Sequence, residues 1–454
     1  MLGGLSIAVP GELDGYGIAH QKFGKLPWHE LFRPAIDFCL QGFAISRSLA
    51  TTLKLERQAI IRNPMLRTLF VKNLTSMETY QEGDVIRHPI LGKTLQIIAN
   101  EGVDAFYNGS LSDKVVAEIR EANGIINRDD LLAYSTSIRS SLNFKIDGDR
   151  TLITVPPPAA GSIVAFVLKA MQDFRLSEDE LSLPYAVGVF HHRLVEAMKF
   201  AFSRKERLSD PDFLAKTKDC RDLVSELFLS YAVAKIDEDK THPVHYYGLL
   251  PWSDEEIELE GGTSHLNVVT KDQIVSMTTS VSNGFGSKVM GYHTGIIYNN
   301  HMKEFWFDFK TCSTNLIFPL RRPISFMSPT IVVEPKGEGF IVIGGSGGAF
   351  IPSVIAQVII KMIWFHKSMK ESIDSRRFAH LLIPDTLLCE RGYDPKLLNI
   401  LKAKGHKIYC FDPYLGGVYT AVQAIRVQKH SSNPDEEIIE AYSDPRKGGG
   451  SAGY

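Results

Sequence analysis

The chain has no excess of charge of one sign. Its 454 residues include 50 Lys and Arg against 52 Asp and Glu, which gives a formal net charge of -2 at pH 7. Proteins that bind nucleic acid or an anionic membrane surface usually carry a basic excess. The balance therefore gives no electrostatic reason to expect such a partner, and it favours a small molecule or a peptide as substrate.

Closely spaced cysteines are also absent. Zinc sites and dense disulfide frameworks depend on such spacing, for example CxxC pairs or cysteines beside histidines. Neither is expected here, and no metal or other cofactor is predicted. An odd number of cysteines leaves at least one thiol free or paired outside the chain. The five cysteines are Cys39, Cys220, Cys312, Cys389 and Cys410.

No apolar run is long enough to span a bilayer. The longest, residues 351–365, is interrupted by Gln357 and Lys361 and predicts a buried helix. The first residues lack the basic start and apolar block of a signal peptide. Residues 1–11 resemble the middle of a domain, so part of the fold is expected upstream of this chain.

The first half of the chain predicts mainly helices. With 44% hydrophobic residues, the chain can bury one large core or two packed layers. Ser110 is expected to cap a helix that ends at Asn123-Gly124. Apolar helices are expected over residues 162–174 and 192–202. The adjacent His191 and His192 are expected to cap or pack rather than to bind a ligand.

The second half predicts strands and then helices. Residues 266–269 and 274–279 flank a polar turn, and residues 330–333 pair across a glycine-containing turn with residues 340–343. Helices are expected from Pro352 onward. Helices, then strands, then helices predict an α/β fold arranged as an αββα sandwich.

The stretch Gly261-Gly262-Thr263 stands directly before the first of these strands. A threonine hydroxyl is a weak nucleophile, but cutting the chain before it exposes an α-amine that can accept the hydroxyl proton. Gly262 can adopt the distorted backbone that brings its carbonyl under attack by the Thr263 oxygen. The alternative is an ordinary turn before a hairpin strand.

A second glycine-rich segment, Gly344-Gly345-Ser346-Gly347-Gly348, lies between the strand over 340–343 and the helix that Pro352 opens. Backbone N–H groups in such a turn can point at one oxygen, and the helix N-terminus adds positive potential. These features predict an oxyanion hole. A phosphate-binding loop and a plain tight turn are the alternatives, although the Gly-Lys-Ser/Thr ending of a phosphate loop is missing.

Together these segments resemble the gamma-glutamyltranspeptidases, also called glutathione hydrolases. The resemblance follows one order along nearly the whole chain. It is carried by residues 8–12, 26–28, 107–110, 261–269, 285–288, 295–300, 327–330, 344–348 and 444–449.

The resemblance implies an N-terminal-nucleophile hydrolase made as a precursor and cut before Thr263. A large fragment (1–262) and a small fragment (263–454) would stay associated, and the acidic segment 237–260 would supply slack before the cut. Thr263 would attack glutathione or another gamma-glutamyl amide and pass the acyl group to an amino acid, a dipeptide or water. Gly347 and Gly348 match the oxyanion-hole glycines. Ser280 stands where the family has a threonine that bonds the nucleophile.

The predicted substrate pocket departs from the family pattern. Ser282 stands where an asparagine is usual, His301 replaces a glutamate, and Glu304 replaces an aspartate. Ser325 matches the first of two serines that contact the substrate carboxylate, and Phe326 replaces the second. The arginine that pairs with this carboxylate in the family lies upstream of Met1. These departures leave two alternatives: a weak or inactive relative acting as a binding scaffold, and an acylase for a different acyl group.

The resemblance also implies a location. The family is typically tethered to the outer face of the plasma membrane by an N-terminal helix, which this chain does not contain. Asn73 and Asn108 begin glycosylation sequons, Asn73-Leu74-Thr75 and Asn108-Gly109-Ser110. They would carry glycans only if the protein enters the secretory pathway.

Overall fold

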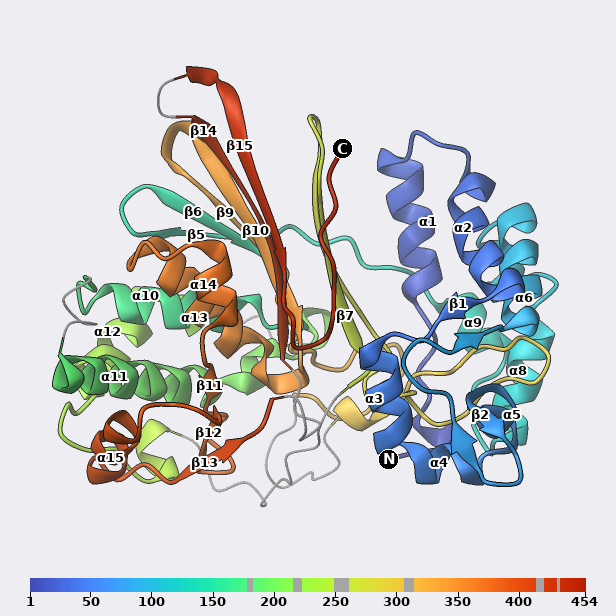
Figure 1. The fold of residues 1–454 in the computed structure, drawn as a ribbon, viewed down its shortest axis with the longest axis horizontal. Coiled ribbons are helices and arrows are strands. Elements are labelled where there is room, and N and C mark those ends of the chain that lie inside the picture. Colours follow the sequence, from blue (N-terminus) through green and yellow to red (C-terminus); the bar gives the residue numbers. More distant parts are fainter. Residues whose placement is uncertain (178–182, 215–222, 249–260, 306–313, 414–419, 431–432) are drawn as a thin grey trace. The chain divides into compact units, whose positions relative to one another are not determined.

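The computed structural model describes residues 1–177, 183–214, 223–248, 261–305, 314–413, 420–430 and 433–454 (Figure 1). It divides into two compact units. Unit 1 comprises residues 1–138 and 279–304, and unit 2 comprises residues 139–278 and 305–454. Both units therefore contain segments from either side of the predicted cut. Residues 249–260 of the predicted slack lie outside the described residues.

Unit 1 is mainly helical, as predicted for the first half of the chain. Its short strands pair as β1 (Phe43–Ala44) with β4 (Val85–Ile86), and as β2 (Val71–Asn73) with β3 (Glu78–Thr79). Its helices are α1 (Glu12–Phe23), α2 (Trp28–Gln41), α3 (Arg47–Leu55), α4 (Arg57–Arg62), α5 (Pro64–Phe70), α6 (Pro89–Glu101), α7 (Asp104–Tyr107), α8 (Ser112–Glu121) and α9 (Arg128–Ala133).

The two ends of α8 test the sequence prediction directly. The proposed cap was wrong: α8 begins at Ser112, and the Ser110 hydroxyl donates to Oε2 of Glu101 at 2.6 Å instead. The predicted end is confirmed. Asn123 adopts φ 62°, a left-handed conformation that asparagine tolerates, and Gly124 N–H donates to the carbonyl of Ile119 at 2.8 Å.

Glu118 on α8 fixes the loop that carries residues 295–300. Its buried carboxylate accepts hydrogen bonds from the N–H groups of His293 (2.6 Å) and Thr294 (2.8 Å). It also accepts from the hydroxyls of Thr294 and Tyr298, both at 2.7 Å. Four donors satisfy the charge without solvent, so this carboxylate ties the loop to the helical layer.

Unit 2 is built on a six-stranded antiparallel sheet. The strand order is β15-β14-β10-β9-β6-β5. The predicted hairpin is confirmed, with Phe340 opposite Val333 and Ile343 opposite Thr330. The strands are β5 (Leu142–Ile146), β6 (Arg150–Thr154), β9 (Thr330–Val333), β10 (Gly339–Ser346), β14 (Ala421–His430) and β15 (Asn433–Ser443).

The helices of unit 2 lie on one side of this sheet, and β7 (Thr263–Val269) lies on the other (Figure 1). The predicted helices over 162–174, 192–202 and 351–365 are confirmed within α10, α11 and α13. Residues from all three build one large buried core. The helices are α10 (Gly161–Gln172), α11 (Pro184–Phe202), α12 (Glu226–Lys235), α13 (Ile351–Ile363), α14 (Met369–Asp374) and α15 (Pro395–Ala403).

The prediction of a helical C-terminal part was wrong. Helices α13 and α14 are followed by strands β11 (Phe378–Ala379) and β12 (Leu387–Glu390), and α15 is followed by β13 (Ile408–Phe411). These strands form a three-stranded sheet. The chain then returns to the large sheet through β14 and β15. In β14, Val422, Ala424 and Val427 are buried, and residues 421–428 of this strand pair with the whole length of β10.

A buried ion network joins the three-stranded sheet of unit 2 to the end of its six-stranded sheet. Arg377 precedes β11, Glu390 ends β12, and Asp444 and Arg446 follow β15. Arg377 Nη2 lies 2.5 Å from Oδ2 of Asp444, while Arg446 Nε and Nη2 lie 2.7 and 2.8 Å from Glu390 oxygens. Asp444 also accepts the N–H of Val422 at 3.1 Å. All four charged side chains are at most 5% exposed, so each depends on its partners for stabilisation.

Replacing Asp444 by Asn should therefore lower the free energy of unfolding by about 3–5 kcal/mol, because the buried Arg377 loses its nearer counter-charge and keeps only Glu390 at 3.8 Å. Denaturant titration measures the change. Asp113→Asn is the control, since its pair with Arg128 is exposed and should contribute less than about 1 kcal/mol. Equal effects of the two substitutions would contradict a stabilising role for the network.

Candidate active site

Thr263 is the first residue of β7 and is buried, with 7% of its surface exposed. The predicted hairpin is confirmed: β7 pairs with β8 (Ile274–Ser280), and Thr270 N–H donates to the carbonyl of Gln273 across the turn at 2.9 Å. Side chains two residues apart share one face of a strand. Thr263 therefore shares a face with His265 and Asn267.

His265 is a neutral hydrogen-bonding group in this face. Its Nε2 lies 2.9 Å from Oδ1 of Asn267, and its Nδ1 lies 2.9 Å from Oγ1 of Thr278. Burial lowers the pKa of His265 to about 4. A neutral ring has one N–H, and Asn267 Oδ1 can only accept. The proton is therefore on Nε2, and Nδ1 accepts from the Thr278 hydroxyl.

The His265 ring fills the space over Gly344 of β10. A Cβ added at Gly344 would lie 2.1 Å from Cε1 of His265, so only glycine fits at this position. Asn267 makes the second connection, because its Nδ2 donates to the carbonyl of Gln423 on β14 at 2.9 Å. These two contacts fix the strand that begins at Thr263 against the large sheet.

The glycine segment forms the predicted turn between strand and helix. Strand β10 ends at Ser346, and a 3-10 turn over Gly348–Phe350 leads into α13. Gly347 has φ 127° and Gly348 has φ 57°, values that residues with side chains rarely adopt. Lys447 donates to the Ser346 hydroxyl at 2.9 Å, and burial lowers its pKa to about 8.

Ser325 lies in the segment before β9. Its N–H donates to the carbonyl of Pro158 at 2.7 Å, and its hydroxyl oxygen accepts the N–H of Met327 at 3.2 Å. The neighbouring Phe326 packs against the core, with its ring centroid 5.9 Å from that of Phe202. Because Phe326 contributes to the core, its presence gives no separate support for an acylase pocket.

The other predicted residues cluster within unit 1. Ser282 Oγ donates to Oε1 of Glu304 at 2.6 Å, and Ser282 N–H donates to Oγ of Ser280 at 2.9 Å. His301 Nε2 lies 3.1 Å from the carbonyl of Ser280. Ser282 has φ 73°, a left-handed conformation uncommon for serine. The structure thus brings together Ser280, Ser282, His301 and Glu304 in unit 1, while Thr263, Ser325, Gly347 and Gly348 belong to unit 2.

Sequence reasoning missed His265, Asn267 and Lys447. A signal for the first two was present at the start of the strand predicted over 266–269, because the polar residues at positions 265 and 267 alternate with Leu266 and Val268. Such a pattern predicts a polar inner face. Lys447 lies 101 residues from its partner Ser346, and no local pattern indicates that contact.

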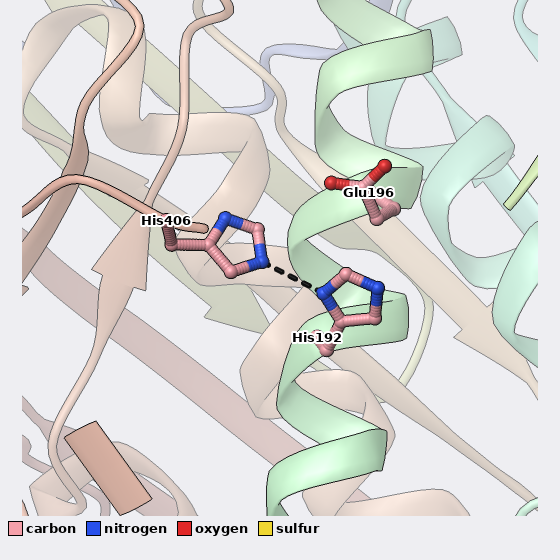
Figure 2. A group of neighbouring side chains, drawn as sticks. All are labelled: His192, Glu196 and His406. Atoms are coloured by element: carbon pink, nitrogen blue, oxygen red, sulfur yellow. Dashed lines mark hydrogen bonds between the residues drawn. The ribbon is translucent and has the colours of Figure 1, made fainter. Parts of the chain in front are cut away.

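Among the residues that the structure describes, His192, Glu196 and His406 form a group that could hold a metal ion (Figure 2). All three are buried, and their donor atoms lie within 4.8 Å of one another. His192 Nδ1 lies 2.7 Å from Nε2 of His406, and His192 Nε2 lies 2.7 Å from the carbonyl of Asp237.

The carboxylate of Glu196 in this group already has hydrogen-bond donors and a cation from the protein beside it. Glu196 accepts hydrogen bonds from the hydroxyls of Tyr247 (2.6 Å) and Thr241 (2.7 Å), and Lys199 Nζ lies 3.7 Å from Oε1. Apart from His406 Nδ1, which is buried without a hydrogen-bond partner, the donors and acceptors of the group are engaged within the core, so we assign it a structural role. The predicted packing role of His192 fits these contacts.

This cluster predicts loss of stability in acid. The carbonyl of Asp237 requires a proton on His192 Nε2, so His406 Nε2–H donates to His192 Nδ1. Burial lowers the pKa of His192 and of His406 below the usual value near 6.5. Burial likewise lowers the pKa of His380, which is not one of the three cluster residues, to about 4. Below pH 6.5 the unfolded chain binds protons that the folded chain excludes. The free energy of unfolding should therefore fall as the pH drops from 6.5 to 4.

Denaturant titrations across this pH range measure the slope. His406→Asn should make it shallower by about 1.4 kcal/mol per pH unit, the value for one titrating group. His29→Asn is the control, because the His29 side chain is 61% exposed, and it should leave the slope unchanged. An unchanged slope in His406→Asn would show that His406 is protonated in the folded protein.

Comparisons with known proteins agree over the whole chain. The family model described as Gamma-glutamyltranspeptidase matches residues 1–454. Glutathione hydrolase 2 of Arabidopsis thaliana is 33% identical over 472 residues, which cover 100% of this chain and 78% of the relative. Scoloptoxin SSD14 of Scolopendra dehaani is 33% identical over 414 residues, which cover 89% and 70%.

A solved structure shows the same fold. The cephalosporin acylase from Bacillus halodurans superposes with a TM-score of 0.79 at 20% identity, covering 97% of this chain and 77% of that one. This similarity confirms the predicted α/β fold of the N-terminal-nucleophile hydrolase type.

Proposed function

The chain belongs to the gamma-glutamyltranspeptidase family, and from that membership we propose that it is a gamma-glutamyl hydrolase or transferase whose nucleophile is Thr263. The observation that carries the proposal is the position of Thr263. It is buried at the start of a strand that His265 and Asn267 fix against the sheet strands β10 and β14. Strand β10 ends at Gly347-Gly348, the proposed oxyanion donors.

In the proposed maturation step, the Thr263 oxygen attacks the carbonyl carbon of Gly262. The peptide C–N bond breaks as the new ester bond forms, and the Thr263 nitrogen takes up a proton. Water then hydrolyses the ester, leaving a carboxylate on Gly262 and a free α-amine and hydroxyl on Thr263. The cut creates both the nucleophile and its base from one residue.

In the proposed turnover step, the Thr263 α-amine accepts the hydroxyl proton while Oγ attacks the γ-carbonyl of the substrate. The N–H groups of Gly347 and Gly348 would stabilise the oxyanion, a contribution of about 3 kcal/mol for each well-placed donor. The leaving amine takes the proton, and a γ-glutamyl ester remains on Thr263. An amino acid, a dipeptide or water then accepts the acyl group. Ser280 would hydrogen-bond the nucleophile.

Glutathione is the proposed acyl donor, because several relatives are named glutathione hydrolases. We assign Ser282 and Glu304 to the substrate α-amino group, since the Glu304 carboxylate is half-buried and already oriented by Ser282 Oγ at 2.6 Å. Ser325 would contact the substrate carboxylate, and His301 would support the loop through its bond to Ser280. No nucleic-acid partner is proposed.

The sheet supports the proposal that the two fragments stay together after the cut. Strands β5 and β6 belong to residues 1–262, whereas β9, β10, β14 and β15 belong to residues 263–454. Strand β6 pairs with β9 from Thr151 opposite Val333 to Thr154 opposite Thr330. The cut would therefore leave one continuous sheet, and separating the fragments would expose two strand edges.

A setting in the secretory pathway or at the outer cell surface stays a proposal. Cys389 and Cys410, opposite each other on β12 and β13, form a disulfide, which is typical of oxidising compartments. The sequon residues Asn73 and Asn108 are both exposed. Within the described ranges of the chain, no helix has the length and apolar character needed to cross a bilayer.

Thr263→Ala should abolish both maturation and turnover. On a denaturing gel the wild type should give two fragments, with Thr263 as the new N-terminus by mass analysis, and Thr263→Ala should give one uncut band. Turnover of a chromogenic γ-glutamyl anilide should fall at least about 10³-fold.

Thr263→Ser is the matched control, because it keeps the hydroxyl and the α-amine. This variant should still mature and still turn over the anilide, but more slowly than the wild type. An uncut wild type whose anilide turnover equals that of Thr263→Ala would reject the enzymatic proposal. That result would favour the alternative of an inactive scaffold.

Glu304→Gln should raise KM for the anilide about 10- to 100-fold with a smaller change in kcat, because it removes a charged partner of the substrate ammonium. Maturation should be unaffected. Glu338→Gln, an exposed residue in the β9–β10 turn, is the control. An unchanged KM in Glu304→Gln would remove Glu304 from the substrate site while leaving the role of Thr263 intact.

A further inference from the structure

We propose that a cavity at the C-terminal end of α13 binds a small monocarboxylate with an apolar, preferably aromatic, body. The cavity has a volume of about 250 Å³, and all of its lining residues belong to unit 2. It is separate from the proposed nucleophile and does not depend on the proposed function. Its walls determine the body of the ligand, and its one half-buried cation determines the headgroup.

The walls are aromatic and firmly packed. Phe190 and Leu194 come from α11, Phe365 follows α13, and Phe378 begins β11. All four are at most 6% exposed, and the Phe190 and Phe365 ring centroids lie 5.1 Å apart in an edge-to-face arrangement. An apolar body of phenyl size would replace water against these rings without requiring them to move.

Lys361 provides the charge. It lies in the last turn of α13, is half-buried, and lines the cavity. Its Nζ donates to Ser375 Oγ at 2.5 Å and to the carbonyl of Arg376 at 3.3 Å, which leaves one of its three N–H donors for a ligand. A carboxylate would complete the set with a charge-assisted hydrogen bond.

The other polar residues of the cavity do not neutralise Lys361. The exposed Lys367 and Glu371 stand at the mouth, and the Glu371 carboxylate is engaged by the N–H and hydroxyl of Ser368 at 3.0 and 2.7 Å. His191 Nδ1 lies 2.7 Å from the carbonyl of Val187, and burial lowers its pKa to about 4, so it carries no charge at pH 7.

Burial also lowers the pKa of Lys361 to about 7, so its charge depends on pH near neutrality. A bound anion favours the protonated amine. Affinity for a carboxylate should therefore be greatest below pH 7 and fall as the pH rises above it. The titratable and charged groups around Lys361 are His191, Lys367, Glu371, Arg377, Glu390 and Arg446.

The test uses 3-phenylpropionate as the probe and the neutral 3-phenyl-1-propanol as its isostere. Calorimetric titration of the full-length protein at pH 6 should show the acid binding at least about tenfold more tightly than the alcohol. Lys361→Met should remove this preference, and Lys361→Arg should retain it. Lys169→Met is the control, because Lys169 stands in the last turn of α10 and does not line the cavity.

Repeating the titrations at pH 9 adds a second readout. Affinity for the acid should fall in the wild type and stay flat in Lys361→Met, and thermal melts check that each variant is folded. Equal binding of acid and alcohol, a preference that survives in folded Lys361→Met, or no binding of either probe would each overturn the proposal. Thr263→Ala should bind the probe like the wild type, so the outcome is independent of the proposed enzymatic activity.

Discussion

The contact between the His265 ring and Gly344 is the constraint on which the proposed chemistry depends. It joins the strand that begins at Thr263 to the strand that ends at the glycine pair. The ring can fill this space because it is neutral and both of its nitrogens are satisfied by Asn267 and Thr278. A charged ring here would have to be solvated, and a side chain at position 344 would displace the strand. His265 on β7 and Gly344 on β10 thus together fix the position of these two strands relative to each other.

The proposed cut and the boundaries of the compact units do not coincide. The chain leaves unit 2 within β8, at Thr278–Thr279, and returns after Glu304. Each unit is therefore closed by contacts between residues on opposite sides of position 263. In unit 1, Glu118 binds the backbone of His293 and Thr294. In unit 2, β6 pairs with β9. A backbone break before Thr263 removes a covalent link but none of these contacts, so the fold can tolerate it.

The sequence predicted helices, strands and helix ends correctly where the local residue pattern was strong. The hairpin of β9 and β10, the apolar helices and the left-handed end at Asn123 each depend on residues within one element, and the sequence indicated them correctly. The C-terminal strands were missed because β14 is stabilised by pairing with β10, about 80 residues away, and β15 by pairing with β14. Ser110 does not cap α8, because its hydroxyl donates instead to Glu101 at the end of α6. The lysine at position 447 and the cluster around His192 likewise depend on partners that no local pattern indicates.

Helix α13 connects two different chemical environments. Its start follows Gly347 and Gly348, where positive backbone potential suits a developing oxyanion, and its last turn carries Lys361, where the negative end of the helix favours a cation. Apart from Lys361, every residue between these ends is buried. A close-packed helix moves as a rigid body, because interiors have few voids into which side chains can shift. This rigidity explains why an apolar core helix can position a backbone-based site at one end and hold a half-buried cation in place at the other.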